Sequence, residues 1–210
     1  MMIKTIHKTN PDYPAAPITY LGDQAPANVF ALGNLDILKE KMSALFCSMK
    51  CPGNLILQTY ELARAWRDAG VAVIGGFHSP MEKECLSFLL RGKQPIVWCP
   101  ARRLTGKRLP KAYAESLSEG RLLILSPFGE SVVRSTRETA RVRNEFVAIF
   151  ADRIFVAYAT PEGQTEAFCR KVITWGKPVL TFKCPENARL LAAGAHPYET
   201  LMTACRHKEA

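Results

Sequence analysis

The sequence lacks several features that would assign it directly to a class of protein. None of its seven cysteines form a CxxC pair, and its four histidines are far apart along the chain. It contains no P-loop and no recognisable Ser/His/Asp arrangement. Internal repeats and low-complexity tracts are also missing. We therefore predict no metal, no cofactor and no disulfide framework.

Long apolar runs are missing as well. The chain has no apolar run of the length that a membrane-spanning helix requires, and its first residues lack the apolar core of a signal peptide. Most cysteines stand inside short apolar runs, such as residues 45–47 and 97–99, where a free thiol behaves as a small buried hydrophobe. These features predict a reduced, cytoplasmic protein with no membrane partner.

Acidic residues are scarce relative to basic ones. The 210 residues include 28 Lys and Arg but 19 Asp and Glu, which gives a net charge of +9. Such an excess favours a polyanionic partner, chiefly nucleic acid, although a solvated basic surface is the alternative interpretation. With 48% hydrophobic and 22% charged residues, the composition is that of a globular domain with a sizeable core.

Apolar strands and amphipathic helices alternate along most of the chain. Strands are predicted at 29–33, 44–48, 71–74, 95–99, 122–126, 153–158 and 178–182, and helices at 55–68, 80–90, 136–150 and 164–175, with a further short helix that ends at Gly120. Continuous apolar strands, each followed by a helix, indicate a parallel sheet covered on both faces. The predicted fold class is α/β, a doubly wound, mostly parallel Rossmann-like sheet.

The chain is predicted to divide into three segments. Residues 1–20 are polar and Pro-rich, and predict an extended N-terminal arm. The Rossmann-like domain is expected to occupy residues 21–185. Residues 186–210 predict a short helical C-terminal appendage.

A phosphate-recognition pattern spans residues 140–167. A basic, amide-bearing helix start precedes a buried strand, which a Gly/Thr turn connects to another helix. Arg143 offers a planar fork of donors. The turn offers backbone N–H groups at a helix N-terminus, where the helix dipole favours anions. A salt bridge from Arg143 to Glu145 or Glu166 is the alternative role for this arginine.

Four loops at the carboxyl ends of the strands are expected to converge on one ligand crevice. In these loops, Gly75 and Gly76 either allow close approach of a phosphate or only permit a tight turn. His78 is a candidate for stacking on a base or for general-base chemistry. A basic loop between residues 102 and 111 would add electrostatic attraction. The candidate phosphate-binding residues are Ser48, Lys50, Gly75, Gly76, His78, Arg102, Arg103, Arg108, Arg143, Asn144, Gly163 and Thr165.

The order of these motifs resembles one family, the DNA-processing proteins DprA/Smf, which are related to the LOG-type nucleotide-binding proteins. Residues 45–50 stand where that family has its Gly-Ser-Arg motif, and residues 75–82 where it has Ser-Gly-Leu-Ala-x-Gly-Ile-Asp. Residues 143–148 align with its Arg-Asn-Arg-Ile-Ile-Ala signature, and residues 162–167 with its Ser-Gly-x-x-x-Thr-Ala turn. Together with its lead-in, the resemblance covers roughly residues 20–183.

Four positions depart from the family pattern. Cys47 replaces a Gly, Met49 an Arg, Glu82 an Asp, and Glu145 the second Arg of the signature. Each lost cation weakens phosphate binding, because backbone phosphate contacts dominate affinity for nucleic acid. The chain thus resembles a divergent, minimal member of the family.

The resemblance implies a protein that binds single-stranded DNA during DNA processing and uptake, as in natural transformation. It also implies a RecA-type recombinase as partner, for recombinase loading, and a homodimer. The alternative, from the LOG-type branch, is a small-nucleotide sensor or a nucleoside-monophosphate phosphoribohydrolase. Hydrolysis would require carboxylates in the crevice, for which Glu82 and Glu166 are the candidates. We predict non-catalytic DNA binding.

Overall fold

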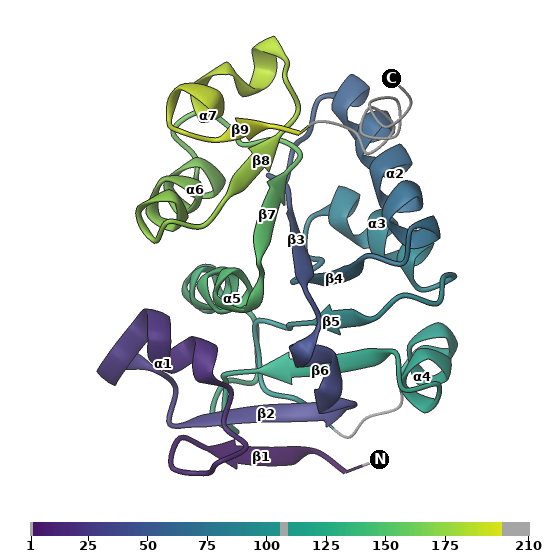
Figure 1. The fold of residues 1–210 in the computed structure, drawn as a ribbon, viewed down its shortest axis with the longest axis vertical. Coiled ribbons are helices and arrows are strands. Elements are labelled where there is room, and N and C mark those ends of the chain that lie inside the picture. Colours follow the sequence, from purple (N-terminus) through teal and green to yellow (C-terminus); the bar gives the residue numbers. More distant parts are fainter. Residues whose placement is uncertain (1, 106–108, 199–210) are drawn as a thin grey trace, which may run out of the picture.

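The computed structural model describes residues 2–105 and 109–198. Its centre is a nine-stranded sheet of order β1-β2-β6-β5-β4-β3-β7-β8-β9 (Figure 1). The strands are β1 (Lys4–His7), β2 (Asn28–Gly33), β3 (Met42–Phe46), β4 (Ala72–Gly75), β5 (Ile96–Trp98), β6 (Leu122–Ser126), β7 (Arg153–Val156), β8 (Val179–Thr181) and β9 (His196–Pro197).

Seven α-helices are described, with three short 3-10 helices. The α-helices are α1 (Ala15–Leu21), α2 (Gly53–Asp68), α3 (Pro80–Leu89), α4 (Lys111–Ser118), α5 (Arg137–Phe150), α6 (Gln164–Thr174) and α7 (Ala188–Ala192). The 3-10 helices are η1 (Gly22–Gln24), η2 (Leu35–Lys39) and η3 (Pro185–Asn187). Among the described residues, none of these helices combines the length and apolar character that crossing a membrane requires.

The sheet is doubly wound, as the sequence predicts. Strands β3 to β9 pair in parallel, whereas β1 and β2 add an antiparallel edge beside β6. From β3 the chain winds outward through β4, β5 and β6, then crosses back to β7 on the other side of β3. This reversal places the topological switch point between β3 and β7, where open α/β sheets bind their ligands.

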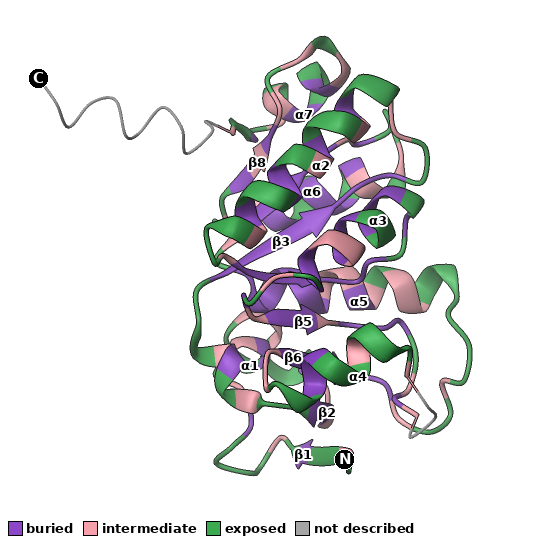
Figure 2. Cartoon of the chain, turned by 90° about the vertical axis from the view of Figure 1, so that its right-hand side faces the viewer, coloured by how far each residue is buried: buried purple, intermediate pink, exposed green. Residues whose placement is uncertain are grey.

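Helices cover both faces of the sheet. Helices α2, α3 and α4 lie on one face, and α1, α5 and α6 on the other (Figure 1). The strands between them are buried, and the outward faces of the helices are exposed to solvent (green in Figure 2). All five residues of β3 and of β6 are buried, which explains why their sequences are continuous apolar runs.

The first twenty residues differ from the predicted extended arm. Lys4–His7 pairs with β2, and α1 packs against α5. Within β1 only Ile6 is buried, so the strand carries no alternating pattern that the sequence could reveal. Tyr13 fixes the following turn by donating its hydroxyl hydrogen bond to the Pro26 carbonyl at 2.7 Å.

The C-terminal segment also differs from a purely helical appendage. After η3 and α7, the chain adds β9 in parallel to β8. The part of the predicted appendage after residue 198 lies outside the described residues.

Helix α5 begins next to residue 136, as the predicted helix over residues 136–150 does, and not near Arg143. Thr136 is the N-cap, and it forms a capping box with Thr139. Arg143 therefore lies in the middle of the helix, so the expectation that it stands at a helix start is wrong.

Candidate functional site

An open pocket of about 630 Å³ lies at the switch point of the sheet. Its walls are the loop that follows β3 and the loop that follows β7, together with the starts of α2 and α6. We call it the switch-point pocket; it is lined by Ser48, Met49, Lys50, Cys51, Pro52, Tyr158, Thr160, Gly163, Gln164 and Thr165.

Ser48 and Thr165 hold the two walls together. The Ser48 hydroxyl donates to Oγ1 of Thr165 at 3.0 Å and accepts the backbone N–H of Thr160 at 2.9 Å. The backbone N–H of Ser48 donates to the Tyr158 carbonyl at 3.0 Å. Ser48 is buried, so its hydroxyl serves to fix the loops rather than to stand free in the pocket.

Two helices begin at the switch-point pocket, and neither has a side-chain cap. Pro52 is the N-cap of α2 and Gly163 is the N-cap of α6, and in the part of the chain that the structure describes no side chain accepts a hydrogen bond from either first turn. The first N–H groups of a helix have no partner within the helix, and the dipole favours an anion beside them. Together with the exposed Lys50, these N-termini give the pocket the chemistry of a phosphate site.

Close packing explains the glycine in the turn before α6. A Cβ added at Gly163 would lie 2.9 Å from the Thr160 carbonyl oxygen, so a larger residue would push the turn apart. The glycine also keeps the backbone at the mouth of the pocket bare, which permits a phosphate to approach closely.

Glu166, in the first turn of α6, stabilises the turn that precedes this helix. Its carboxylate accepts the backbone N–H of Glu162 at 3.0 Å and pairs with Arg170 at 2.8 Å and with Arg189 at 3.3 Å. The hydrogen bond from Arg170 and that from the Glu162 backbone lower the pKa of Glu166 to about 2. Glu166 is therefore ionised and fully engaged, and it does not line the pocket.

The carboxyl ends of β4 and β5 are closed, in contrast to the switch point. A Cβ at Gly76 would lie 1.8 Å from Nη1 of Arg143, and a Cβ at Gly75 would lie 3.0 Å from the Phe77 ring. Arg143 is 4% exposed. Protein side chains thus occupy the space that the two glycines leave, where the sequence suggested a phosphate or a tight turn.

Arg143 forms neither of the salt bridges that were considered for it. Its Nε donates to Oδ1 of Asn144 at 2.8 Å, and its Nη1 donates to the Cys99 carbonyl at 3.1 Å. Burial lowers the pKa of Arg143, an effect that the negative charge of Glu82 opposes. The geometry favours an internal role for this guanidinium.

Glu82 connects the ends of β3 and β4. Its Oε1 accepts the backbone N–H of Cys47 at 2.8 Å, and its Oε2 accepts the backbone N–H of His78 at 2.7 Å. Burial raises the pKa of Glu82, while the charge of Arg143 and the backbone hydrogen bonds oppose that rise. Glu82 does not line the switch-point pocket, so neither candidate carboxylate for hydrolysis faces it.

The remaining candidates among the described residues do not line the switch-point pocket. His78 is exposed, and partial desolvation and the charge of Arg143 lower the pKa of its imidazole below the ordinary value. Arg102 is exposed, whereas Arg103 forms an ion pair with Glu130. Arg108 lies outside the described residues.

The structure therefore brings four of the predicted residues together and separates them from the other candidates that it describes. Ser48, Lys50, Gly163 and Thr165 line one pocket. Asn144 lines a different pocket, between α5 and α6. The expectation that all four loops form one crevice is wrong, because Arg143 and Phe77 fill the β4 end of the sheet.

Several residues of the pocket were not singled out as candidates from the sequence. They are Met49, Cys51, Pro52, Tyr158, Thr160 and Gln164. Their common signal is position, since all lie in the loops after β3 and β7 or at the start of α6. This shared position cannot be recognised without the strand order, because only the order shows that these two loops flank the switch point.

Two thiols lie in the loop after β3. A hydrogen bond between Cys47 and Cys51 raises the pKa of Cys47 and lowers the pKa of Cys51. Cys51 is partly exposed and lines the switch-point pocket. Among the described residues, no group of three or more His, Cys, Asp or Glu side chains is arranged to hold a metal ion.

The strand order defines an α/β protein of the Rossmann-like class, and its pocket lies at the switch point, the position where such sheets usually bind ligands. Among solved structures, the chain is similar to DNA processing protein A (DprA) from Streptococcus pneumoniae, with a TM-score of 0.77 and 17% identity over 99% of this chain and 75% of that one. It is equally similar to DprA from Helicobacter pylori, whose structure describes a single-stranded DNA binding mode, with a TM-score of 0.77 and 15% identity over 98% of this chain and 95% of that one.

A more distant similarity connects the chain to another group. The molybdenum cofactor carrier protein from Chlamydomonas reinhardtii matches with a TM-score of 0.54 and 13% identity, over 81% of this chain and 97% of that one. Scans against protein-family models and against curated proteins gave no match. The chain has the DprA-like Rossmann fold that its motifs predict, and this prediction is confirmed.

Proposed function

We propose that this protein binds single-stranded DNA and holds its phosphates in the switch-point pocket. The observation that carries the proposal is the convergence of two uncapped helix N-termini on one open pocket beside Lys50. The net charge of +9 and the DprA-like fold support a polyanionic ligand.

Binding of this kind does not depend on the nucleotide sequence of the DNA. Backbone N–H groups and Lys50 contact phosphate oxygens, which are the same for every nucleotide. Met49 is 61% exposed at the pocket and, with Tyr158, offers an apolar surface to a base. The basic loop with Arg102 adds attraction at longer range.

The wider role that we propose is the handling of incoming DNA in the cytoplasm. It would include DNA processing and uptake, as in natural transformation, with a RecA-type recombinase as partner and a homodimer as the active form. The support is the likeness in fold to DprA and the order of the DprA-like motifs. In this proposal Gly75, Gly76 and Arg143 have a structural role beneath the binding surface, since protein side chains fill the space beside the two glycines.

A free nucleotide is the second candidate ligand. The same pair of helix N-termini suits a single phosphate group, and the molybdenum cofactor carrier shares the core of the fold. A hydrolase would need a free carboxylate in the pocket. Glu82 and Glu166 are instead bound to backbone N–H groups and lie outside the lining, which favours binding over catalysis.

Fluorescence anisotropy with a labelled single-stranded oligonucleotide tests the proposal. We expect tight binding that weakens steeply as salt is raised, and that free nucleotides do not displace. Easy displacement by a nucleoside monophosphate would favour the second candidate, and absence of binding to either ligand would overturn both.

Lys50→Ala and Lys41→Ala form a matched pair for this experiment. The two exposed lysines flank β3, but Lys50 is at its carboxyl end and Lys41 precedes its amino end. Loss of a phosphate contact at Lys50 should weaken binding and reduce the salt slope by about 0.7, the value for one contact to a single strand. Lys41→Ala should bind as the parent protein does, and an equal effect of both variants would contradict this placement.

A further inference from the structure

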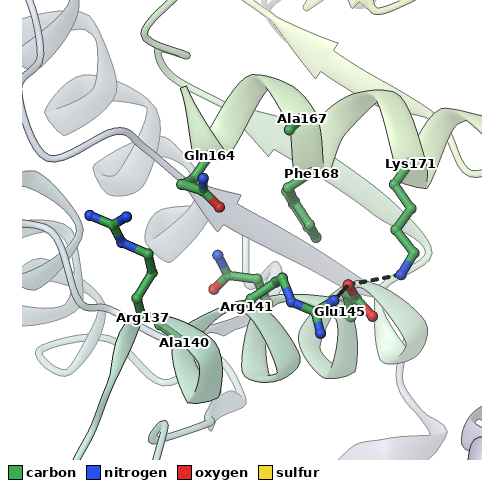
Figure 3. A pocket seen from close by; sticks show the side chains of 9 residues that line it. Arg137, Ala140, Arg141, Glu145, Gln164, Ala167, Phe168 and Lys171 are labelled. Carbon is green, nitrogen blue, oxygen red and sulfur yellow. Dashed lines mark hydrogen bonds and ion pairs between the residues drawn. The ribbon is translucent and has the colours of Figure 1, made fainter. Parts of the chain in front are cut away.

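A second pocket, of about 330 Å³, lies between α5 and α6. We call it the α5–α6 pocket. Ala140, Ala167 and Phe168 form its apolar floor, and Arg137, Arg141 and Lys171 stand around its rim (Figure 3). Figure 3 shows the Phe168 ring pointing from α6 toward α5.

The sequence of the two facing helices explains why this pocket is open. Residues three and four apart share one face of a helix, so Arg137, Ala140, Arg141 and Asn144 form the stripe of α5 that meets α6. Seams between packed helices normally carry larger apolar side chains. Here small and charged residues alternate, and the charged ones remain at the surface because burying them unpaired would be costly.

The rim of the pocket is positively charged overall. Arg141 and Lys171 bind the same carboxylate oxygen, Oε1 of Glu145, at 2.8 and 2.9 Å. Within residues 2–105 and 109–198, Arg137 forms no ion pair and Oε2 of Glu145 accepts no hydrogen bond. Arg141 also pairs with Glu138 at 2.6 Å, so the three cations face two carboxylates. One positive charge remains in excess, which attracts an anion, and Glu145 retains an acceptor for an N–H group.

The α5–α6 pocket adjoins the switch-point pocket. Gln164, the first residue of α6, lines both. Arg137 and Gln164 mark the two helix starts at the same end of the α5–α6 pocket (Figure 3). A ligand that leaves the switch-point pocket past Gln164 therefore meets Arg137 and then the apolar floor.

We propose that the α5–α6 pocket holds one unpaired base of the DNA strand whose phosphates occupy the switch-point pocket, so this inference rests on the proposed function. The Phe168 edge and the two alanines contact the base, and Arg137 contacts the adjoining phosphate. The Asn144 and Gln164 amides and Oε2 of Glu145 meet the polar edge of the base. A base combines a flat apolar face with a polar edge and is attached to a phosphate, which is the chemistry that this pocket matches.

Ala167→Trp tests the proposal because the new ring would fill the pocket without changing its charge. Ala167 is exposed on α6, and the matched control, Ala65→Trp, makes the same substitution at an exposed position of α2 on the other face of the sheet. We expect Ala167→Trp to weaken binding of a long single strand about tenfold, the typical loss of one base contact. Ala65→Trp should bind as the parent protein does, and thermal unfolding of both variants checks that they remain folded.

Strands with an abasic nucleotide separate base contacts from phosphate contacts. We expect an abasic position, scanned along an oligonucleotide just long enough for a single binding register, to weaken binding to the parent at one position. That position should have no further effect on Ala167→Trp, because both changes remove the same contact. Normal binding of Ala167→Trp, or equal abasic effects on both proteins, would overturn the inference while leaving the proposed function intact. Failure of the parent protein to bind any single strand would instead refute the proposed function.

Discussion

The two halves of the carboxyl edge of the sheet have opposite characters. At the ends of β3 and β7, the loops leave an open pocket with two uncapped helix N-termini. At the ends of β4 and β5, Arg143 and Phe77 cover the backbone of Gly76 and Gly75, and Glu82 is buried beside them. Loops that follow parallel strands thus border an open pocket in one half and form a packed support in the other.

The comparison shows what a glycine pair implies in this fold. Removal of a Cβ creates space beside the backbone, but it does not determine whether a ligand or a side chain fills that space. At Gly76 an arginine from α5 fills it, and at Gly163 the Thr160 carbonyl of the same turn lies against it, beside a pocket that stays open. The closed half then supports the open one, because Glu82 holds the backbone N–H of Cys47 at the start of the loop that forms the pocket wall.

The largest effect is expected from Arg143→Met, which leaves Glu82 buried without its compensating charge. We expect a loss of about 3 kcal/mol in the free energy of unfolding, measured by urea denaturation. Burial would raise the pKa of Glu82 further above its ordinary value once the charge of Arg143 is gone. The folded state would then bind a proton more tightly than the unfolded state, so stability should fall as the pH rises through and above the usual range for glutamate.

Glu82→Gln in the Arg143→Met background is the control for that result. It removes the buried charge, keeps an acceptor for one backbone N–H, and should abolish the added pH dependence. If Arg143→Met proves as stable as the parent protein at every pH, the closed half is not an electrostatically coupled support.

Gly76→Ala should have the next largest effect. The added Cβ would lie 1.8 Å from Nη1 of Arg143, so the guanidinium or the strand end must move. We expect a loss of about 2 kcal/mol in the free energy of unfolding. Gly129→Ala is the matched control, since its Cβ would come no closer than 3.7 Å to Phe30. Equal stability of the two variants would show that Arg143 does not depend on the glycine.

Glu166→Gln should have a smaller effect, in the turn beside the open half. The variant loses the charge that pairs with Arg170 and Arg189, and we expect a cost of about 1 kcal/mol at neutral pH. Because the pKa of Glu166 is lowered to about 2, its contribution to the stability of the folded state is complete above the ordinary glutamate range. This contribution is lost as the pH falls toward the lowered pKa. Thermal unfolding across this acid range should show the parent and the variant converging, and parallel curves would contradict the assignment.

The sequence predicts most of this fold. Periodicity identifies β3 to β8 and the helices from α2 to α6, since their buried faces are continuous or regularly spaced. It does not identify β1, where Ile6 is the single buried residue, or β9, which has two residues. Such short edges are fixed by pairing with a neighbouring strand rather than by a pattern of their own.

The candidate site could be predicted only in part. Ser48, Lys50, Gly163 and Thr165 follow from the rule that ligands bind at the carboxyl ends of parallel strands. Arg143 is a phosphate-binding candidate by residue type, yet its side chain turns inward to Cys99 and Asn144. The sequence could not show this, because an arginine in the middle of α5 is exposed or buried according to how the helix packs on β3 and β4.

Alkylation of Cys51 most directly tests the claim that the open half is the ligand site. This thiol is partly exposed in the switch-point pocket and its pKa is lowered, whereas Cys47, Cys85, Cys99 and Cys169 are buried. Cys184 is also partly exposed but does not line the pocket, so it is the internal control. Mass spectrometry would follow the modification of each cysteine with and without saturating single-stranded DNA. We expect bound DNA to slow the alkylation of Cys51 strongly and to leave Cys184 unchanged; an unchanged rate at Cys51 under saturation would place the ligand elsewhere and contradict the account.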